Sequence, residues 1–502
     1  MIRNHHRDTE TTEAVSVSSS PRSPRGGWGG TLAGLLLCVL CASVVHPAPA
    51  SDEEWSGHRG GPARTGNIDG KAGPAHPKVL WVHRSKEQFI SPPSAAANRL
   101  FVTVMGAFNT GALRVFDTGG DGKAPAWSKG APSVRLPTVG SPVTSAGRVV
   151  FGEGMHQTDG SSLHCLRSEN GRPIWRLDVP GELVHIEASP TIANGRVVVG
   201  GGSAGVICVD LNHVSLNGKE MGTAEAEAQI EKMWKEMADK YEIEKKKDPD
   251  FAIPPNEAAL PKPSPRILWQ KGKGAWHVDA PVLVAGEKVF VTSAFLDKEK
   301  LGDRSLVCLN AADGAELWKT PLKYNAWAGA TLAGDRVIVP CSTIRYDPKE
   351  LPMAKGEVVA IKVADGSVEW RKDTSGAVLA TAAASGDTVV ICDTDGQIRG
   401  LDARSGAPKW GGKVGAAFFA GPAVAGDAIY AADIDGMVHS VGLADGKPRW
   451  KLDLGNDAAV KAPGMVYGSP VVHGGRLYVG TCNIEGKWTG QETVIVCIGE
   501  GK

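Results

Sequence analysis

Apolar and polar positions alternate over short stretches of this chain, and the stretches recur in units of similar length. The clearest unit is SLVCLNAADGAELW, Ser305 to Trp318: an alternating apolar stretch, an Asp-Gly turn and a second stretch that ends on tryptophan. Alternation with a period of two is typical of half-buried β-strands, and Asp-Gly is a preferred hairpin turn. The pattern therefore predicts a series of β-hairpins.

A tryptophan closes each unit and defines the period, which is 40 to 52 residues except for one gap of 94. After the tryptophan, a stretch leads to a small residue and a proline, as in Ser141-Pro142, and a β-branched stretch follows, as at 196–201. About four strand-like stretches per period indicate a β-propeller. The structural tryptophans are Trp81, Trp127, Trp175, Trp269, Trp318, Trp370, Trp410 and Trp450.

The two ends of the repeat region are out of phase. Eight strands precede an expected turn, the last within residues 493–500, but Trp81 comes before the first of them. The stretch 78–81 can therefore supply the missing outer strand of the last blade, which leaves no open edge in the ring. We predict an all-β fold over residues 79–502: an eight-bladed β-propeller of four-stranded antiparallel blades, closed by an N-terminal strand.

The gap of 94 residues holds an insertion, residues 211–265. Within it, residues 223–247 have apolar side chains at helical spacing, and Asp248-Pro249 ends the pattern. A Pro-rich return stretch follows. One interpretation is that this helix packs its apolar stripe on its own blade; the other is that it docks a partner protein. The stripe consists of Ala226, Ile230, Met233, Trp234, Met237 and Tyr241.

The N-terminal 50 residues have the pattern of a signal peptide with a long leading region. An apolar stretch, Thr31 to Val45, is followed by Ala48-Pro49-Ala50, a small-x-small cleavage pattern. We expect a periplasmic or secreted protein without a membrane span after cleavage, or an N-terminal membrane anchor if the signal is uncleaved. Residues 51–78 are rich in glycine and lack periodicity, and we expect an extended arm that contacts the body through Trp55.

Composition removes some classes of function. Lys+Arg and Asp+Glu both number 55, so no basic surface for nucleic acid is expected. Nine cysteines occur, and the seven after residue 50 include no adjacent pair and no CxxC motif. Several stand between apolar neighbours in predicted strands. We therefore expect these thiols to be buried as small apolar groups.

The unit L-x-x-x-D/N-G-x-x-x-W, the Ser-Pro step and the leading WSGHRGGPARTGN together resemble the PQQ-like (quinoprotein-type) β-propeller repeat family. That family includes pyrroloquinoline quinone alcohol dehydrogenases and the envelope assembly scaffold BamB. The resemblance implies the propeller fold, and a BamB-like architecture implies a non-catalytic binding or scaffold protein of the cell envelope. Its protein partner would bind a propeller face or the helix at 223–247.

The enzymes of the same family suggest the alternative function. The resemblance would imply a vicinal disulfide over the quinone and a calcium ion held by Glu, Asn and Asp, but this chain has no adjacent cysteines and no matching constellation. No cofactor is therefore expected. PQQ with calcium belongs to the alternative, a quinone- or metal-dependent oxidoreductase with its site at the propeller channel. No catalytic or cofactor-binding residue is assigned, and enzymatic activity is not expected.

Two His-x-acid pairs are candidates for a metal site. His185 and Glu187 stand just before one Ser-Pro step, and His277 and Asp279 stand just before the next Ala-Pro step. We expect each pair on one face of a strand, and because the two pairs belong to neighbouring blades they can meet at the channel mouth. Histidine and carboxylate suit zinc-like ions. The alternative is a set of ordinary His–carboxylate hydrogen bonds.

Overall fold

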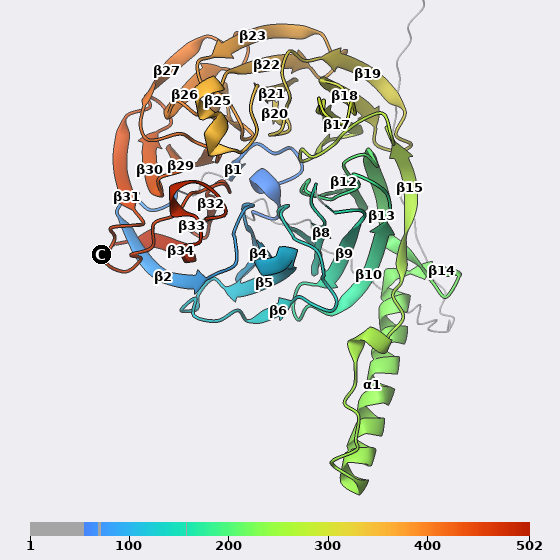
Figure 1. Ribbon diagram of the computed structural model, residues 1–502. Helices are drawn as coiled ribbons and strands as arrows, with labels where there is room; N and C mark the ends of the chain where they lie inside the picture. The colour runs from blue at the N-terminus through green and yellow to red at the C-terminus, as the bar shows by residue number, and fades with distance from the viewer. Residues whose placement is uncertain (1–54, 69–71, 157, 502) are drawn as a thin grey trace, which may run out of the picture. The chain divides into compact units, whose positions relative to one another are not determined.

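The computed structural model describes residues 55–68, 72–156 and 158–501. The predicted signal peptide, residues 1–50, lies outside the described residues. Within the unit that begins at Ala48, the chain forms eight sheets. Each has four antiparallel strands that run in order from an inner to an outer position, and two of the sheets carry a fifth strand. The inner strands of successive sheets contact one another and the eighth contacts the first, so the sheets form a closed ring (Figure 1). The predicted eight-bladed propeller is confirmed.

The first four blades contain the following strands. Blade 1 has β3 (Ser94–Ala96), β4 (Arg99–Met105), β5 (Gly111–Asp117) and β6 (Trp127–Lys129). Blade 2 has β7 (Val143–Ser145), β8 (Arg148–Glu153), β9 (Ser161–Arg167) and β10 (Pro173–Val179). Blade 3 has β11 (Thr191–Ala193), β12 (Arg196–Gly200), β13 (Val206–Leu216) and β15 (Ser264–Lys271), with β14 (Lys219–Gly222) paired to the end of β13. Blade 4 has β16 (Leu283–Ala285), β17 (Lys288–Ser293), β18 (Ser305–Asn310) and β19 (Glu316–Pro321).

The last four blades complete the ring. Blade 5 has β20 (Thr331–Ala333), β21 (Arg336–Ser342), β22 (Gly356–Lys362) and β23 (Val368–Thr374). Blade 6 has β24 (Ala383–Ser385), β25 (Thr388–Cys392), β26 (Gln397–Asp402) and β27 (Pro408–Lys413). Blade 7 has β28 (Ala423–Ala425), β29 (Ala428–Ala432), β30 (Met437–Gly442) and β31 (Pro448–Asp453), with β1 (Asn67–Ile68) parallel to β28. Blade 8 has β32 (Val471–His473), β33 (Arg476–Gly480), β34 (Thr493–Glu500) and β2 (Pro77–Ser85).

The ring closes through pairing of the two ends of the repeat region. Strand β2 pairs antiparallel with β34, with Trp81 opposite Cys497. The N-terminal strand is therefore the outer strand of the last blade, as the phase of the repeats predicts. Each of the eight structural tryptophans lies in the outer strand of its blade. The core consists of apolar side chains packed between neighbouring sheets, and it includes the seven cysteines of the described part, which are all buried and unpaired.

The arm that precedes the ring runs along the inner strands, where its carbonyls accept hydrogen bonds from one blade after another (Figure 1). Trp55, which is fully buried, accepts from Ala95 of blade 1 at 2.8 Å, and Gly66 accepts from Val424 of blade 7 at 2.8 Å. Four other carbonyls of the arm, those of Ser56, Pro62, Ala63 and Thr65, accept from Thr144, Val284, Leu332 and Ala384. The arm thus satisfies inner-strand N–H groups that no neighbouring strand can reach.

The arm is not extended throughout. It contains a short 3₁₀ helix, η1 (His58–Gly60), and Arg64, which is fully buried, donates to carbonyls of both the arm and the ring. The other 3₁₀ helices, η2 (Ala107–Asn109), η3 (Glu257–Ala259), η4 (Pro348–Met353) and η5 (Gly486–Trp488), lie in connections between strands. The arm is therefore tied to the ring by side chains as well as by its backbone.

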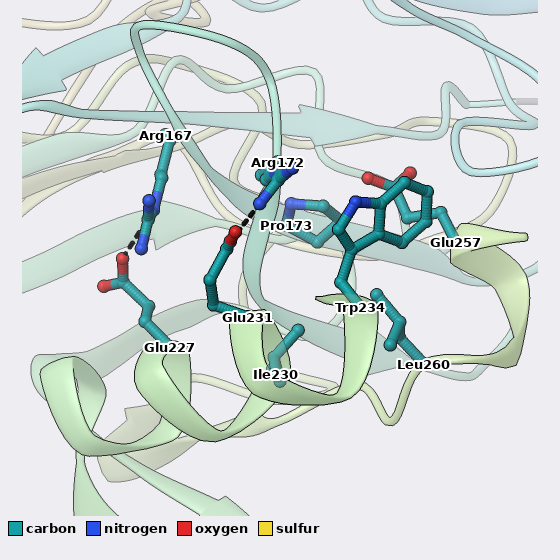
Figure 2. A pocket seen from close by; sticks show the side chains of 9 residues that line it. All are labelled: Arg167, Arg172, Pro173, Glu227, Ile230, Glu231, Trp234, Glu257 and Leu260. Atoms are coloured by element: carbon teal, nitrogen blue, oxygen red, sulfur yellow. Dashed lines mark hydrogen bonds and ion pairs between the residues drawn. The ribbon is translucent and has the colours of Figure 1, made fainter. Parts of the chain in front are cut away.

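Helix α1 (Thr223–Lys247) has the bounds that the sequence predicts. Its first half contacts β13 and β14 of its own blade 3, in line with one of the two interpretations, and it also contacts β10 of the neighbouring blade 2. Glu227 pairs with Arg167 at 2.9 Å and Glu231 pairs with Arg172 (Figure 2). The insertion departs from blade 3 at a point beside the outer strand of blade 2. The helix that follows therefore contacts that strand. The later part of the helix extends away from the ring (Figure 1).

Candidate functional site

A cavity of about 350 Å³ lies at the centre of the ring, and we call it the funnel. Its lining comes from the connections that lead into the inner strands and from connections that follow the second strands of blades 2, 5 and 8, with contributions from all eight blades and from His58 of the arm. One wall, from blades 5, 7 and 8, is rich in aromatic side chains, including Trp327, Tyr346, Phe419 and Tyr467. The other wall, from blades 2 to 4, contains histidines and carboxylates. All four residues proposed from the two His-x-acid pairs belong to this second wall or lie directly behind it.

Asp279 is the centre of the polar wall because it accepts hydrogen bonds from two histidines. Nε2 of His185 lies 2.7 Å from its Oδ1, and Nε2 of His277 lies 2.7 Å from its Oδ2. Both imidazoles are fully buried, and 16% of the Asp279 side chain is exposed. The carboxylate accepts only, so each ring donates an N–H from Nε2. One carboxylate therefore joins blades 3 and 4 at the funnel.

The backbone around these rings fixes their position. His277 and Asp279 flank Val278, which exchanges two backbone hydrogen bonds of 3.1 Å with Gly202 in the turn between β12 and β13. Gly202 has φ of +57°, and a Cβ there would lie 2.6 Å from Cε1 of His185. Only glycine suits both the left-handed backbone and this close approach. The turn of blade 3 therefore holds His185 on one side and His277 on the other.

The predicted pairs are rearranged in one respect. His277 bonds to the acid of its own pair, but His185 bonds to Asp279 of the next blade and not to Glu187. Glu187 accepts instead from the backbone N–H of His156. Both pairs lie in the connections before β11 and β16 and not on regular strands, so the expected strand alternation does not apply. The proline follows His185 one residue later than it follows His277, so the two pairs stand at different distances from their prolines.

A third histidine, His156, joins the cluster, and sequence reasoning missed it. It lies in the connection between β8 and β9 of blade 2, and its ring centroid lies 5.2 Å from that of His185 and 5.6 Å from that of His277. Its side chain is 28% exposed, and its Nε2 lies 3.8 Å from Glu299. The repeats place no histidine here in other blades. That departure from the repeat, at the funnel end of the adjacent blade, was the available signal.

The charges of the cluster shift several pKa values. Burial alone would lower the pKa of His185, but the hydrogen bond and charge of Asp279 raise it above its ordinary value. Burial would raise the pKa of Asp279, but the two imidazoles hold it far below the usual range. Burial and the nearby charge of Asp279 raise the pKa of Glu187. For His156, burial and the neighbouring His185 lower the pKa, which favours a neutral ring with a free nitrogen.

The donor atoms of this wall suit a transition metal better than calcium. Ligand atoms of His156, His185 and His277 lie within 4.8 Å of one another, as do those of His185, Glu187 and Asp279. Calcium prefers six to eight oxygen ligands, whereas imidazole nitrogens suit zinc and similar ions. In addition, no two cysteines are adjacent in the sequence. The funnel therefore does not fit PQQ with calcium as the quinoprotein enzymes hold it.

The family model described as "Outer membrane protein assembly factor BamB" matches residues 71–235, 258–419 and 351–487. The chain belongs to this family. The matches leave out residues 236–257, which belong to the insertion. No curated protein matches this chain. Membership confirms the predicted PQQ-like, BamB-like architecture.

Solved structures similar to this BamB-family chain include another BamB and dehydrogenases. BamB from Moraxella catarrhalis is 14% identical with a TM-score of 0.53, and the match covers 84% of this chain and 97% of that one. Quinohemoprotein alcohol dehydrogenase from Comamonas testosteroni is 11% identical with a TM-score of 0.59, covering 90% and 81%. A europium-containing methanol dehydrogenase is 11% identical with a TM-score of 0.57, covering 89% and 98%. At these identities the likeness shows the fold alone.

No helix among the described residues has the length and apolar content needed to cross a bilayer.

Proposed function

We propose that the chain is a non-catalytic binding protein of the cell envelope, periplasmic or secreted, and that its ligand binds in the funnel. The observation that carries the proposal is the two-sided lining of this cavity. Its volume of about 350 Å³ is within the range of ligand pockets, about 300–1,000 Å³. An apolar wall that faces a wall with a few charged groups is the usual composition of such pockets.

The aromatic wall offers stacking surfaces for an apolar group. The rings of Phe419 and Tyr467 meet edge to face at 5.3 Å, and the guanidinium of Arg345 lies 4.9 Å from the centroid of Trp327. The opposite wall offers hydrogen-bonding groups of His156, Glu187 and Asp279. A ligand that suits both walls is amphipathic, for example an aromatic or aliphatic side chain of a partner protein next to a polar backbone. We therefore favour an extended segment of a protein as the ligand.

The helix of the insertion is a second surface for a partner, but it carries less of the proposal. Beyond its contacts with blade 2, the insertion exposes large apolar side chains: Ile243 is 56% exposed, Phe251 82% and Ile253 77%. Exposed apolar groups of this size are found at interaction surfaces. These apolar side chains do not indicate which kind of partner would bind, whereas the funnel has a defined volume and lining.

The proposal is tested by isolating the protein gently from cells that produce it and recording its mass under native conditions. Wild-type protein should carry a discrete additional mass, and Trp327→Ala should lose at least about nine-tenths of it because the apolar wall is shortened. Leu317→Ala is the matched control, since Leu317 is 47% exposed on the outer strand β19. An additional mass that is equal in wild type and Trp327→Ala, or absent from both, would contradict the proposal.

The alternative, a metal- or quinone-dependent oxidoreductase, keeps one observation in its favour: the histidine cluster in the funnel can ligate a metal. Adding calcium and pyrroloquinoline quinone to the purified protein and assaying dye-linked alcohol oxidation tests it. Because the donor atoms do not suit calcium, we expect neither a bound quinone spectrum nor oxidation. Either result would favour the enzyme over the binding protein.

A further inference from the structure

Three imidazoles from two neighbouring loops and a hairpin converge on one point of the funnel wall. The ring centroids of His156, His185 and His277 lie 5.2 to 5.6 Å apart in all three pairs. One ring nitrogen of each lies within 4.8 Å of the others. A zinc ion with nitrogen ligands at about 2.0–2.1 Å would need these atoms about 3.4 Å apart in a tetrahedral site. Moving the ring nitrogens toward one another by about an ångström closes this difference.

Two of the three rings are held in place before any ligand binds. His185 and His277 are fully buried, and their Nε2 atoms point at the same carboxylate, that of Asp279. The backbone N–H of His277 donates to Ser293 at 3.2 Å, and its carbonyl accepts from Ala294 at 2.9 Å. Rigid supporting contacts of this kind orient metal ligands. The site therefore requires little rearrangement on the side of blades 3 and 4.

The third ring is the adjustable one. His156 is 28% exposed and lines the funnel, whereas the two buried rings lie behind the lining. It can move toward a bound ion without disturbing the core. Its position also leaves the ion accessible from the cavity, as in zinc sites that keep one coordination position open.

Charge balance favours a divalent cation at this point. Asp279 accepts hydrogen bonds from both buried rings. Glu187 accepts a hydrogen bond from the backbone N–H of His156, beside them. A divalent ion would replace the protons now held between the imidazole nitrogens and Asp279, and the carboxylate would become a fourth ligand or orient one. Two carboxylates and three neutral imidazoles form a suitable ligand set for such an ion.

We infer that His156, His185 and His277, with Asp279 beside them, form a binding site for a zinc-class divalent transition metal. This site goes beyond the proposed binding function, because metal can bind whether or not the funnel takes a protein segment. The competing interpretation is that the cluster only ties blades together through hydrogen bonds.

Zinc alone is the probe. The full-length protein is freed of metal with a chelator and titrated with Zn²⁺ by calorimetry, beside His156→Gln, His277→Gln and the control His213→Gln. His213 is a half-exposed histidine that bonds to Asp210 outside the cluster. Wild type and His213→Gln should bind one equivalent more tightly than the two cluster variants do. Loss of outer-sphere partners costs 10–100-fold in affinity, so loss of a ligand should cost at least about 100-fold.

Replacing zinc with Co²⁺ gives an independent spectroscopic readout. The visible spectrum of bound cobalt reports tetrahedral coordination, and X-ray absorption should count three imidazoles in wild type and two in His156→Gln. Since His156 is partly exposed, its variant should keep the wild-type circular dichroism, and the test does not depend on the buried His277. Equal zinc affinity and stoichiometry in wild type and a folded His156→Gln would overturn the inference. So would a wild type that takes up no zinc.

Discussion

The indole of Trp370 in blade 5 packs against Gly406 in the outer turn of blade 6. Its Nε1–H donates to the carbonyl of Ala403 in the same turn at 3.1 Å. A Cβ on Gly406 would lie 2.6 Å from Cδ2 of the indole, and φ of this glycine is +67°. The tryptophan and the glycine of the sequence repeat are thus partners across a blade boundary. Five other pairs have the same tryptophan–glycine contact: Trp81–Gly122, Trp127–Gly171, Trp269–Gly314, Trp318–Gly366 and Trp410–Gly446.

This contact predicts a specific loss of stability. Gly406→Ala places a methyl group against the indole and strains the backbone, so the free energy of unfolding should fall by about 2–4 kcal/mol. Gly386→Ala is the matched control in the same blade: its φ is +55°, but no atom lies within 4 Å of the added Cβ. It should cost about 1 kcal/mol, from the backbone alone. Urea unfolding followed by tryptophan fluorescence measures both, and equal losses would contradict the role of the indole contact.

Arg64 ties the arm to the ring. Its guanidinium donates to the carbonyls of Val282 at 2.7 Å, His58 at 3.1 Å and Ser189 at 3.2 Å. Arg64→Ala should lower the free energy of unfolding by about 2–4 kcal/mol, because buried carbonyls lose their donor. Arg304→Ala, which removes an exposed ion pair with Asp297, should change it by less than about 1 kcal/mol. Denaturant titration compares the two, and a small effect at Arg64 would count against the arm as a structural element.

Acid sensitivity should arise in blade 2. Burial would raise the pKa of Glu153, but His164 and two backbone N–H groups lower it to about 2. A carboxyl with a lowered pKa adds stability above its unfolded value of 4.5, and this stability is lost as the pH falls from there toward 2. The free energy of unfolding that this carboxylate contributes, and that is lost on acidification, is roughly 3 kcal/mol.

Glu153→Gln should therefore make the free energy of unfolding less dependent on pH between about 4.5 and 2. The measurement is urea unfolding at a series of pH values in that interval. Glu169→Gln, at an exposed position in the next turn, is the control and should follow the wild-type curve. A Glu153→Gln curve parallel to that of wild type would show that the carboxylate does not contribute as described.

The docking of helix α1 predicts a local effect. Arg172 lies 5.5 Å from the ring centroid of Trp234 and also pairs with Glu231, so this group joins the helix to blade 2 (Figure 2). Trp234→Ala should speed amide hydrogen exchange over residues 230–247 by about 10-fold while the melting temperature stays within about 2 °C. Glu236→Ala, on an exposed part of the helix, should leave exchange unchanged. Unaltered exchange in Trp234→Ala would mean that other contacts hold the helix.

The sequence predicted most of the fold because the determinants of the fold recur. A tryptophan repeats in each blade, Asp-Gly turns and small-Pro steps recur in several of them, and the displaced Trp81 indicates how the ring closes. The site was harder to predict because it depends on contacts between blades. Two His-x-acid pairs could be selected, but the bond from His185 to Asp279 crosses a blade boundary. His156 comes from a connection that no repeat marks. The side on which α1 packs likewise depends on where blade 2 ends in space.

Ligand binding in the funnel is tested most directly by photo-cross-linking in cells that make the protein. A benzophenone amino acid is placed at Ile484, which is 38% exposed and lines the funnel, or at Leu317, which is 47% exposed on β19. We predict a discrete cross-linked species when the benzophenone is at position 484 and none when it is at position 317. The species should be lost when Trp327→Ala is added to the protein that carries the benzophenone at position 484. The same cross-links from both positions, or none from position 484, would contradict binding in the funnel.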